Sequence, residues 1–179
     1  MARSAKDVAA VVRQRLPDVP SKKLHKLLYY AQGHHLAAFH RPLFVETVSA
    51  FDMGPVVGQL WWAEKNEGSV PASAELDEAE LNTVGYVLAR YGGMSGRDLE
   101  ILSHQEQPWR RADLTREPGG SVRIERDWME AYFLEPDEDE IDLDGSEVSA
   151  WLSDAPGRLS HDGQRDDPQE VRNRLGALA

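Results

Sequence analysis

The chain of 179 residues has 41% hydrophobic residues, a formal net charge of −11 and no cysteine. The lack of cysteine excludes disulfides, thiolate catalysis and cysteine-ligated metal sites, and no apolar run approaches the roughly 18 residues that a membrane span requires. We therefore expect a cytoplasmic protein with one folded domain and no membrane segment.

The charge is distributed unevenly along the chain. Residues 1–112 carry 13 Lys and Arg against 13 Asp and Glu, whereas residues 113–179 carry 7 basic and 18 acidic residues. Eight acidic residues and no basic one lie between Glu135 and Glu147, and such a segment cannot bury enough apolar surface to offset the entropy of ordering it. We predict a folded domain over residues 1–134 and a flexible acidic tail over residues 135–179, with nascent helices at 146–152 and 168–178.

The first 40 residues predict two helices. Ser4 with Asp7 three positions later is a plausible capping box, and apolar residues then follow at helical spacing up to Pro17. We expect Ser21 to cap a longer second helix that ends near Phe39. Its apolar face is wide, which is typical of a central helix that is contacted from several sides.

A short strand and a third helix are expected next. The β-branched and aromatic residues over Thr47–Phe51 favour extended structure. We interpret Gly54 and Pro55 as a turn into the third helix, with Pro55 near its first position. This helix would carry Trp61 and Trp62, and because adjacent helical residues cannot both face one core, at least one indole should lie at the surface.

Three further segments complete the predicted domain. A fourth helix starts at Asp77, where Glu80 completes a capping box, and ends at Gly92 in a left-handed cap. A fifth helix starts at Ser95, with Asp98 three positions later as in the other capping boxes, and a sixth covers residues 124–133. The pattern as a whole predicts a mainly α protein, a compact bundle of about six helices with at most a short strand or hairpin.

The histidines do not form a recognisable catalytic or metal-binding pattern. His34 and His35 are adjacent and diverge by about 100° on a helix, and the chain has no HExxH motif. His104 with Glu106 could act in general acid–base catalysis, but the sequence has neither a nucleophile motif nor a phosphate-binding loop. We therefore expect no metal, no cofactor and no enzyme activity.

Four short motifs occur in order along the folded part. They are KLLYYAQG at 26–33, RPLF at 41–44, a small-aromatic pair followed by GPVV within 50–57, and HQEQPW at 104–109. Together they resemble the signature of the Panacea domain, the antitoxin domain of bacterial and phage toxin–antitoxin pairs, which also occurs in a proteolysis adaptor. The resemblance implies structural roles for the signature residues Gly33, Pro42, Leu43, Phe44, Gly54, Pro55, His104, Pro108 and Trp109.

The last of these motifs has the features of a helix end. Pro108 would stop the helix, Trp109 would fold back over the core, and the imidazole of His104 would bond a free carbonyl in the last turn.

The resemblance implies an antitoxin that neutralises a cognate protein toxin by direct binding, in the setting of a prophage or of phage defence. Two alternatives stay open: an adaptor that delivers a bound protein to an ATP-dependent protease, and a hydrolase that uses His104. We expect no nucleic-acid partner, and we leave self-association into a homo-oligomer open. The residues we expect to contact the partner are Trp61, Trp62, Tyr30, Arg110 and Arg111.

Overall fold

The computed structural model describes residues 3–68 and 74–135, which form seven helices and three short strands. The helices are α1 (Ala5–Arg15), α2 (Ser21–Phe39), α3 (Gly58–Glu67), α4 (Glu78–Tyr91), α5 (Gly96–Gln105), α6 (Gln107–Asp113) and α7 (Arg126–Leu134). The strands are β1 (Val48–Phe51), β2 (Gly54–Val57) and β3 (Val122–Arg123). The mainly α prediction is thus confirmed, whereas the predicted tail lies outside the described residues from position 136 onward.

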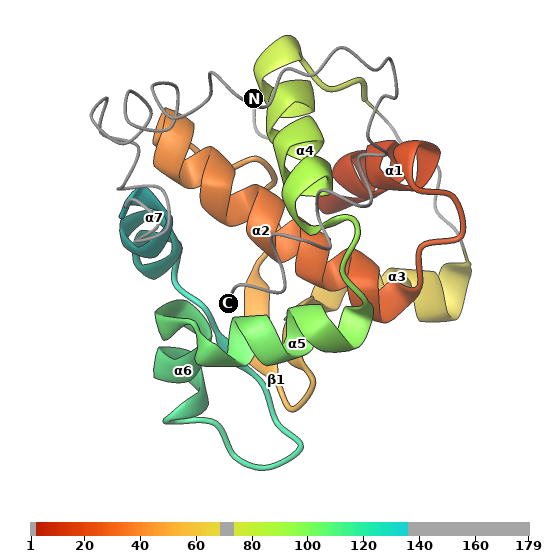
Figure 1. Ribbon diagram of the computed structural model, residues 1–179. Coiled ribbons are helices and arrows are strands. Elements are labelled where there is room, and N and C mark those ends of the chain that lie inside the picture. The colour runs from red at the N-terminus through yellow and green to blue at the C-terminus, as the bar shows by residue number, and fades with distance from the viewer. Residues whose placement is uncertain (1–2, 69–73, 136–179) are drawn as a thin grey trace, which may run out of the picture. The chain divides into compact units, whose positions relative to one another are not determined.

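The α2 helix lies at the centre of the domain. It contacts α1, α4, α5, α7 and β2, and Figure 1 shows it crossing the middle of the domain with α4 and α7 on either side. Twelve of its 19 residues are buried, as expected for a helix that is covered on several faces. None of the helices within the described ranges is both long and apolar enough to cross a lipid bilayer.

Local signals specify where most helices begin. Capping boxes start α1, α4 and α5 at Ser4, Asp77 and Ser95, as predicted. The start of α2 differs from the prediction, because Pro20 is the N-cap and Ser21 is the first helical residue, without a side-chain capping bond.

The end of α4 also differs from the prediction. Gly92 has φ −62° and therefore lies in the right-handed region, so the expected left-handed cap is wrong. A Cβ at this position would lie 2.3 Å from the carbonyl oxygen of Leu88. The glycine at this position allows a close backbone approach and does not supply a positive φ.

The segment expected to turn into the third helix is a β-hairpin. Strands β1 and β2 pair antiparallel, with Phe51 opposite Gly54 and Ala50 opposite Pro55, and the strand order is β2-β1-β3. Proline is tolerated here because β2 is an edge strand. The predicted helix start at Gly54-Pro55 is wrong, since α3 begins only at Gly58.

A short helix that the sequence analysis missed follows α5. The α5 helix ends at Gln105, and Pro108 lies in the first turn of α6, where its missing N–H has no intrahelical partner to lose. Pro108 therefore separates two helices and does not simply end one.

Candidate functional site

A buried carboxylate joins two of the signature motifs. Glu106, between α5 and α6, accepts hydrogen bonds from the hydroxyls of Tyr29 (2.8 Å) and Tyr30 (2.9 Å). Burial first, and the charge of Glu106 second, raise the pKa of both tyrosines. Tyr30 also stacks on Tyr91, with ring centroids 4.0 Å apart. Because Tyr30 has no exposed surface, the structure places this expected contact residue in the core.

A buried lysine lies beneath the hairpin. Lys26 is 1% exposed, and its Nζ donates to the carbonyl oxygen of Pro55 at 3.2 Å. Burial lowers the pKa of Lys26 to about 8. Gly54 has φ +97°, and a Cβ there would lie 2.7 Å from Cε of Lys26. Gly54 and Pro55 therefore cover and bond the lysine of the first motif, which is a structural role.

The loop that follows α2 is held by a buried amide. Oε1 of Gln32 accepts from the backbone N–H groups of Leu43 (2.8 Å) and Phe44 (3.2 Å), and its Nε2 donates to the carbonyl of Phe44 at 3.0 Å. Leu43 and Phe44 are fully buried. Pro42 directly precedes this pair, and it lies two residues after His40, the left-handed C-cap of α2. The RPLF motif thus anchors a loop onto the central helix.

Gly33 of α2 lies where this helix packs against α7. A Cβ at Gly33 would lie 2.2 Å from two carbon atoms of the Phe133 ring in α7. That ring is surrounded by the aromatic side chains of Tyr29, Tyr30 and His34, with centroids 5.7, 6.0 and 4.7 Å away.

His104 and Trp109 form a stacked pair on the outside of this core. Their ring centroids are 3.9 Å apart, and Trp109 is 8% exposed, so it covers the core as predicted. His104 stacks on the indole with its Nε2 buried, and neither this atom nor Nε1 of Trp109 has a hydrogen-bond partner among the described residues. Burial lowers the pKa of His104, which favours the neutral imidazole.

Two further histidines are internal structural residues. His25 accepts a hydrogen bond at Nδ1 from the N–H of Val57 at 3.3 Å, and burial lowers its pKa to about 4. Nδ1 of His35 lies 2.9 Å from the hydroxyl oxygen of Thr83. Within the part of the chain that the structure describes, no three His, Asp or Glu side chains lie together as metal ligands.

The two tryptophans of α3 form an exposed apolar surface. Trp61 is 44% exposed and Trp62 is 58% exposed, so the prediction that at least one indole lies at the surface is confirmed. The ammonium group of Lys65 lies 4.8 Å from the ring centroid of Trp61. An ion pair of 2.6 Å joins Arg13 of α1 to Glu64 of α3.

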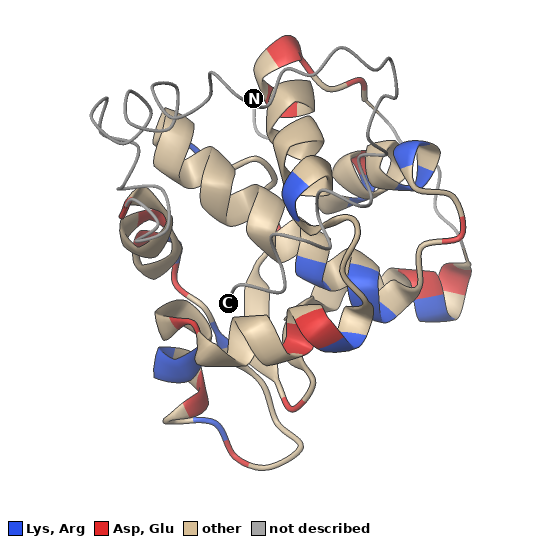
Figure 2. Ribbon diagram, viewed as in Figure 1, with Lys and Arg blue, Asp and Glu red and all other residues tan. Residues whose placement is uncertain are grey.

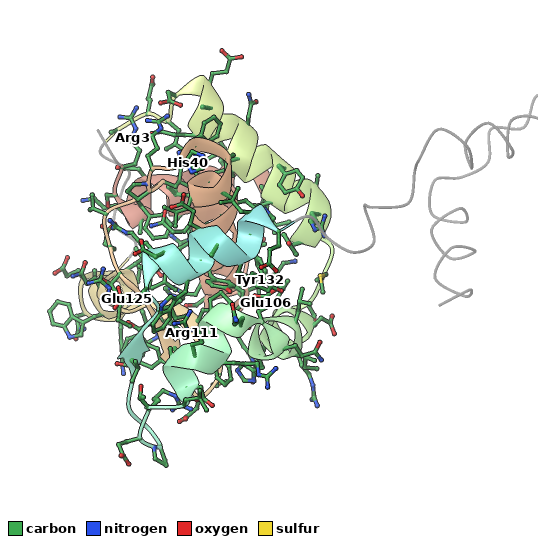
Figure 3. The ribbon with its side chains drawn as sticks, turned by 90° about the vertical axis from the view of Figure 1, so that its left-hand side faces the viewer. Arg3, His40, Glu106, Arg111, Glu125 and Tyr132 are labelled. Atoms are coloured by element: carbon green, nitrogen blue, oxygen red, sulfur yellow. The ribbon has the colours of Figure 1, made fainter. Side chains whose placement is uncertain are left out.

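Arg110 and Arg111 belong to a second surface. Both are exposed on α6, and Cζ of Arg111 lies 4.3 Å from the ring centroid of Trp128. Figure 3 shows Arg111 and Tyr132 on the same face of the domain, and Figure 1 shows α3 and α6 on opposite sides. The expected contact residues therefore divide into two separate surfaces and one core residue.

A comparison with protein families matches residues 24–110 to the family described as Antitoxin SocA-like, Panacea domain. Comparisons with curated proteins and with solved structures found no match. The matched span runs from α2 into α6 and includes the four motifs. The α1 and α7 helices lie outside it, although both contact α2.

Proposed function

We propose that this chain is an antitoxin that neutralises a cognate protein toxin, because residues 24–110 match the family described as Antitoxin SocA-like, Panacea domain. The neutralisation is a stoichiometric protein–protein complex, without a chemical step on the toxin.

The feature that indicates the position of the binding site is the exposed pair Trp61 and Trp62 on α3. Tryptophan is enriched among the residues that dominate binding energy at interfaces, and each large aromatic side chain can bury on the order of 150–250 Å². The two indoles project from a regular helix that is joined to α1 by the ion pair between Arg13 and Glu64, and a preformed helix lowers the entropy that binding costs. We therefore assign the toxin contact to this helix.

The geometry around His104 supports binding over catalysis. Its ring lies against Trp109, and the carboxylate oxygens of nearby Glu106 each accept a tyrosine hydroxyl. Residues that already make these buried contacts hold α5 and α6 together. A general acid–base pair would instead need both groups within reach of a substrate.

The test uses the full chain and the product of the adjacent reading frame, co-expressed and co-purified. Trp61→Ala combined with Trp62→Ala should weaken the complex by roughly 30-fold or more, the loss expected for a hot spot, with an unchanged melting temperature. Ile101→Ala on α5 is the matched control, because Ile101 is an apolar residue that is 50% exposed, and it should bind normally. Undiminished binding by the double variant would refute the assignment to α3.

Two further measurements separate this function from the alternatives. An antitoxin that acts by binding should protect cells that lack their ATP-dependent proteases, whereas an adaptor should not. His104→Gln should leave neutralisation stoichiometric. Inactivation of many toxin molecules by one molecule of this chain would contradict the binding mechanism.

A further inference from the structure

A groove of about 640 Å³ lies beside α6, a helix that Figure 1 shows on the other side of the domain from α3. It is lined by the last residues of α5, by α6 and by Tyr132 of α7. Leu114 at its edge is 85% exposed, and Leu114 and Tyr132 both lie outside the segment that matches the Panacea family. The groove therefore includes surface that the family match does not cover.

The groove carries positive charge that the described part of the domain leaves unneutralised. Neither Arg110 nor Arg111 forms an ion pair with any described residue, and Arg111 lies over Trp128. The acidic residue among the described lining residues, Asp113, is paired with Arg116 at 2.7 Å. Figure 2 shows the basic residues of α6 at this end of the domain.

The wall of the groove also contains a stacked aromatic pair. Trp109 is 8% exposed and lines the groove, and the ring of His104 lies on it with ring centroids 3.9 Å apart. Nε1 of Trp109 and Nε2 of His104 are buried beneath this surface, so a ligand in the groove meets the arginines first. The charge of Arg110 and Arg111 therefore points to an anionic ligand.

We propose that this groove binds an acidic, partly apolar peptide segment of a partner protein. Carboxylates of the segment pair with Arg110 and Arg111, since guanidinium groups bind carboxylates with two parallel hydrogen bonds. An apolar side chain of the segment lies against Leu114 and Tyr132. The groove is a second interaction surface, distinct from the tryptophan surface of α3.

A peptide fits the groove better than a nucleic acid does. Arg110 and Arg111 are the arginines that line it, which suits a short acidic segment better than a long phosphate backbone, because a backbone needs a series of basic contacts along its length. The exposed side chain of Leu114 also favours a ligand that has apolar groups.

The test measures fluorescence anisotropy of a labelled peptide of alternating Asp, Glu and Leu residues, titrated with the full chain. Arg110→Gln combined with Arg111→Gln should weaken binding at least tenfold, because each charged hydrogen bond is a substantial part of the affinity. Arg97→Gln is the matched control, because Arg97 is exposed on α5 and lies outside the groove. Binding should also weaken as the salt concentration rises.

Three results would overturn the proposal. The first is equal binding of the peptide by the wild type and the double arginine variant, and the second is equal binding of a peptide with Asn and Gln in place of its acids. The third is tighter binding of a single-stranded oligonucleotide, which would make the groove a nucleic-acid site. The variant with Trp61→Ala and Trp62→Ala should bind the peptide normally, so this test is independent of toxin binding.

Discussion

Replacing Gly33 by alanine should destabilise the protein, although the same change usually stabilises a helix. Alanine in place of glycine within a helix contributes about 1 kcal/mol of stability. At Gly33, however, the new Cβ would lie 2.2 Å from the Phe133 ring, against the roughly 3.4 Å or more of ordinary contact. The ring cannot rotate away freely, since Tyr29, Tyr30 and His34 surround it.

The magnitude follows from two ways of relieving the clash. Moving α7 strains a packed interface, and overpacking of this kind typically costs about 1–3 kcal/mol. Expelling the Phe133 ring loses its burial, which for a fully buried side chain is worth roughly 1.5–3 kcal/mol and for this partly buried ring is less. With the helix propensity gain of about 1 kcal/mol subtracted, we expect a net loss of about 1 kcal/mol in the free energy of unfolding.

The assay is urea unfolding of the full chain at 25 °C, followed by circular dichroism. Gly85→Ala in α4 is the matched control, because a Cβ there would meet only the flexible end of Arg15 at 3.2 Å, and this variant should be stabilised. In a Phe133→Ala background, Gly33→Ala should also become stabilising. If Gly33→Ala proves as stable as Gly85→Ala, or still destabilises without the Phe133 ring, the steric reasoning is wrong.

Two further predictions concern the buried polar groups. The pKa of Lys26 is about 8 in the folded protein, against the ordinary lysine value of 10.5. Between these two values the unfolded chain binds more protons than the folded one. The free energy of unfolding should therefore rise by roughly 2 kcal/mol from pH 8 to pH 10. This rise should disappear in Lys26→Met when thermal melting is followed across that range, and a pH profile unaffected by the substitution would refute the assignment to Lys26. Glu106→Ala leaves the hydroxyls of Tyr29 and Tyr30 without their acceptor, which should cost roughly 1–3 kcal/mol of unfolding free energy for each hydroxyl when measured by urea unfolding. Glu106→Gln keeps one acceptor oxygen and should cost less. Equal losses for the two variants would contradict the account.

The helical framework was predictable because its signals are local. The capping boxes at Ser4, Asp77 and Ser95 depend on residues three positions apart, and such contacts form in almost any environment of the helix. The exposure of an indole on α3 was also predictable, since Trp61 and Trp62 point in different directions on any helix.

The errors arose where distant contacts override local preference. Gly54 and Pro55 look like a helix start, but pairing with β1 and the bond from Lys26 make them a strand. Tyr30 looks like a contact residue, but Glu106, 76 positions later, binds its hydroxyl in the core. Neither partner can be identified from the neighbouring sequence.

The sequence by itself therefore determined the helical class, most helix starts and the family signature, because periodicity, capping and motif order are properties of short segments. Only the tertiary structure decided which signature residues are internal, and that the candidate contact residues lie on two separate surfaces. The physical reason is that burial and hydrogen-bond satisfaction depend on which segments meet in space. Arg110 and Arg111 became a candidate site only when the structure placed them with Tyr132 in the lining of one groove and showed no ion pair between them and any described residue.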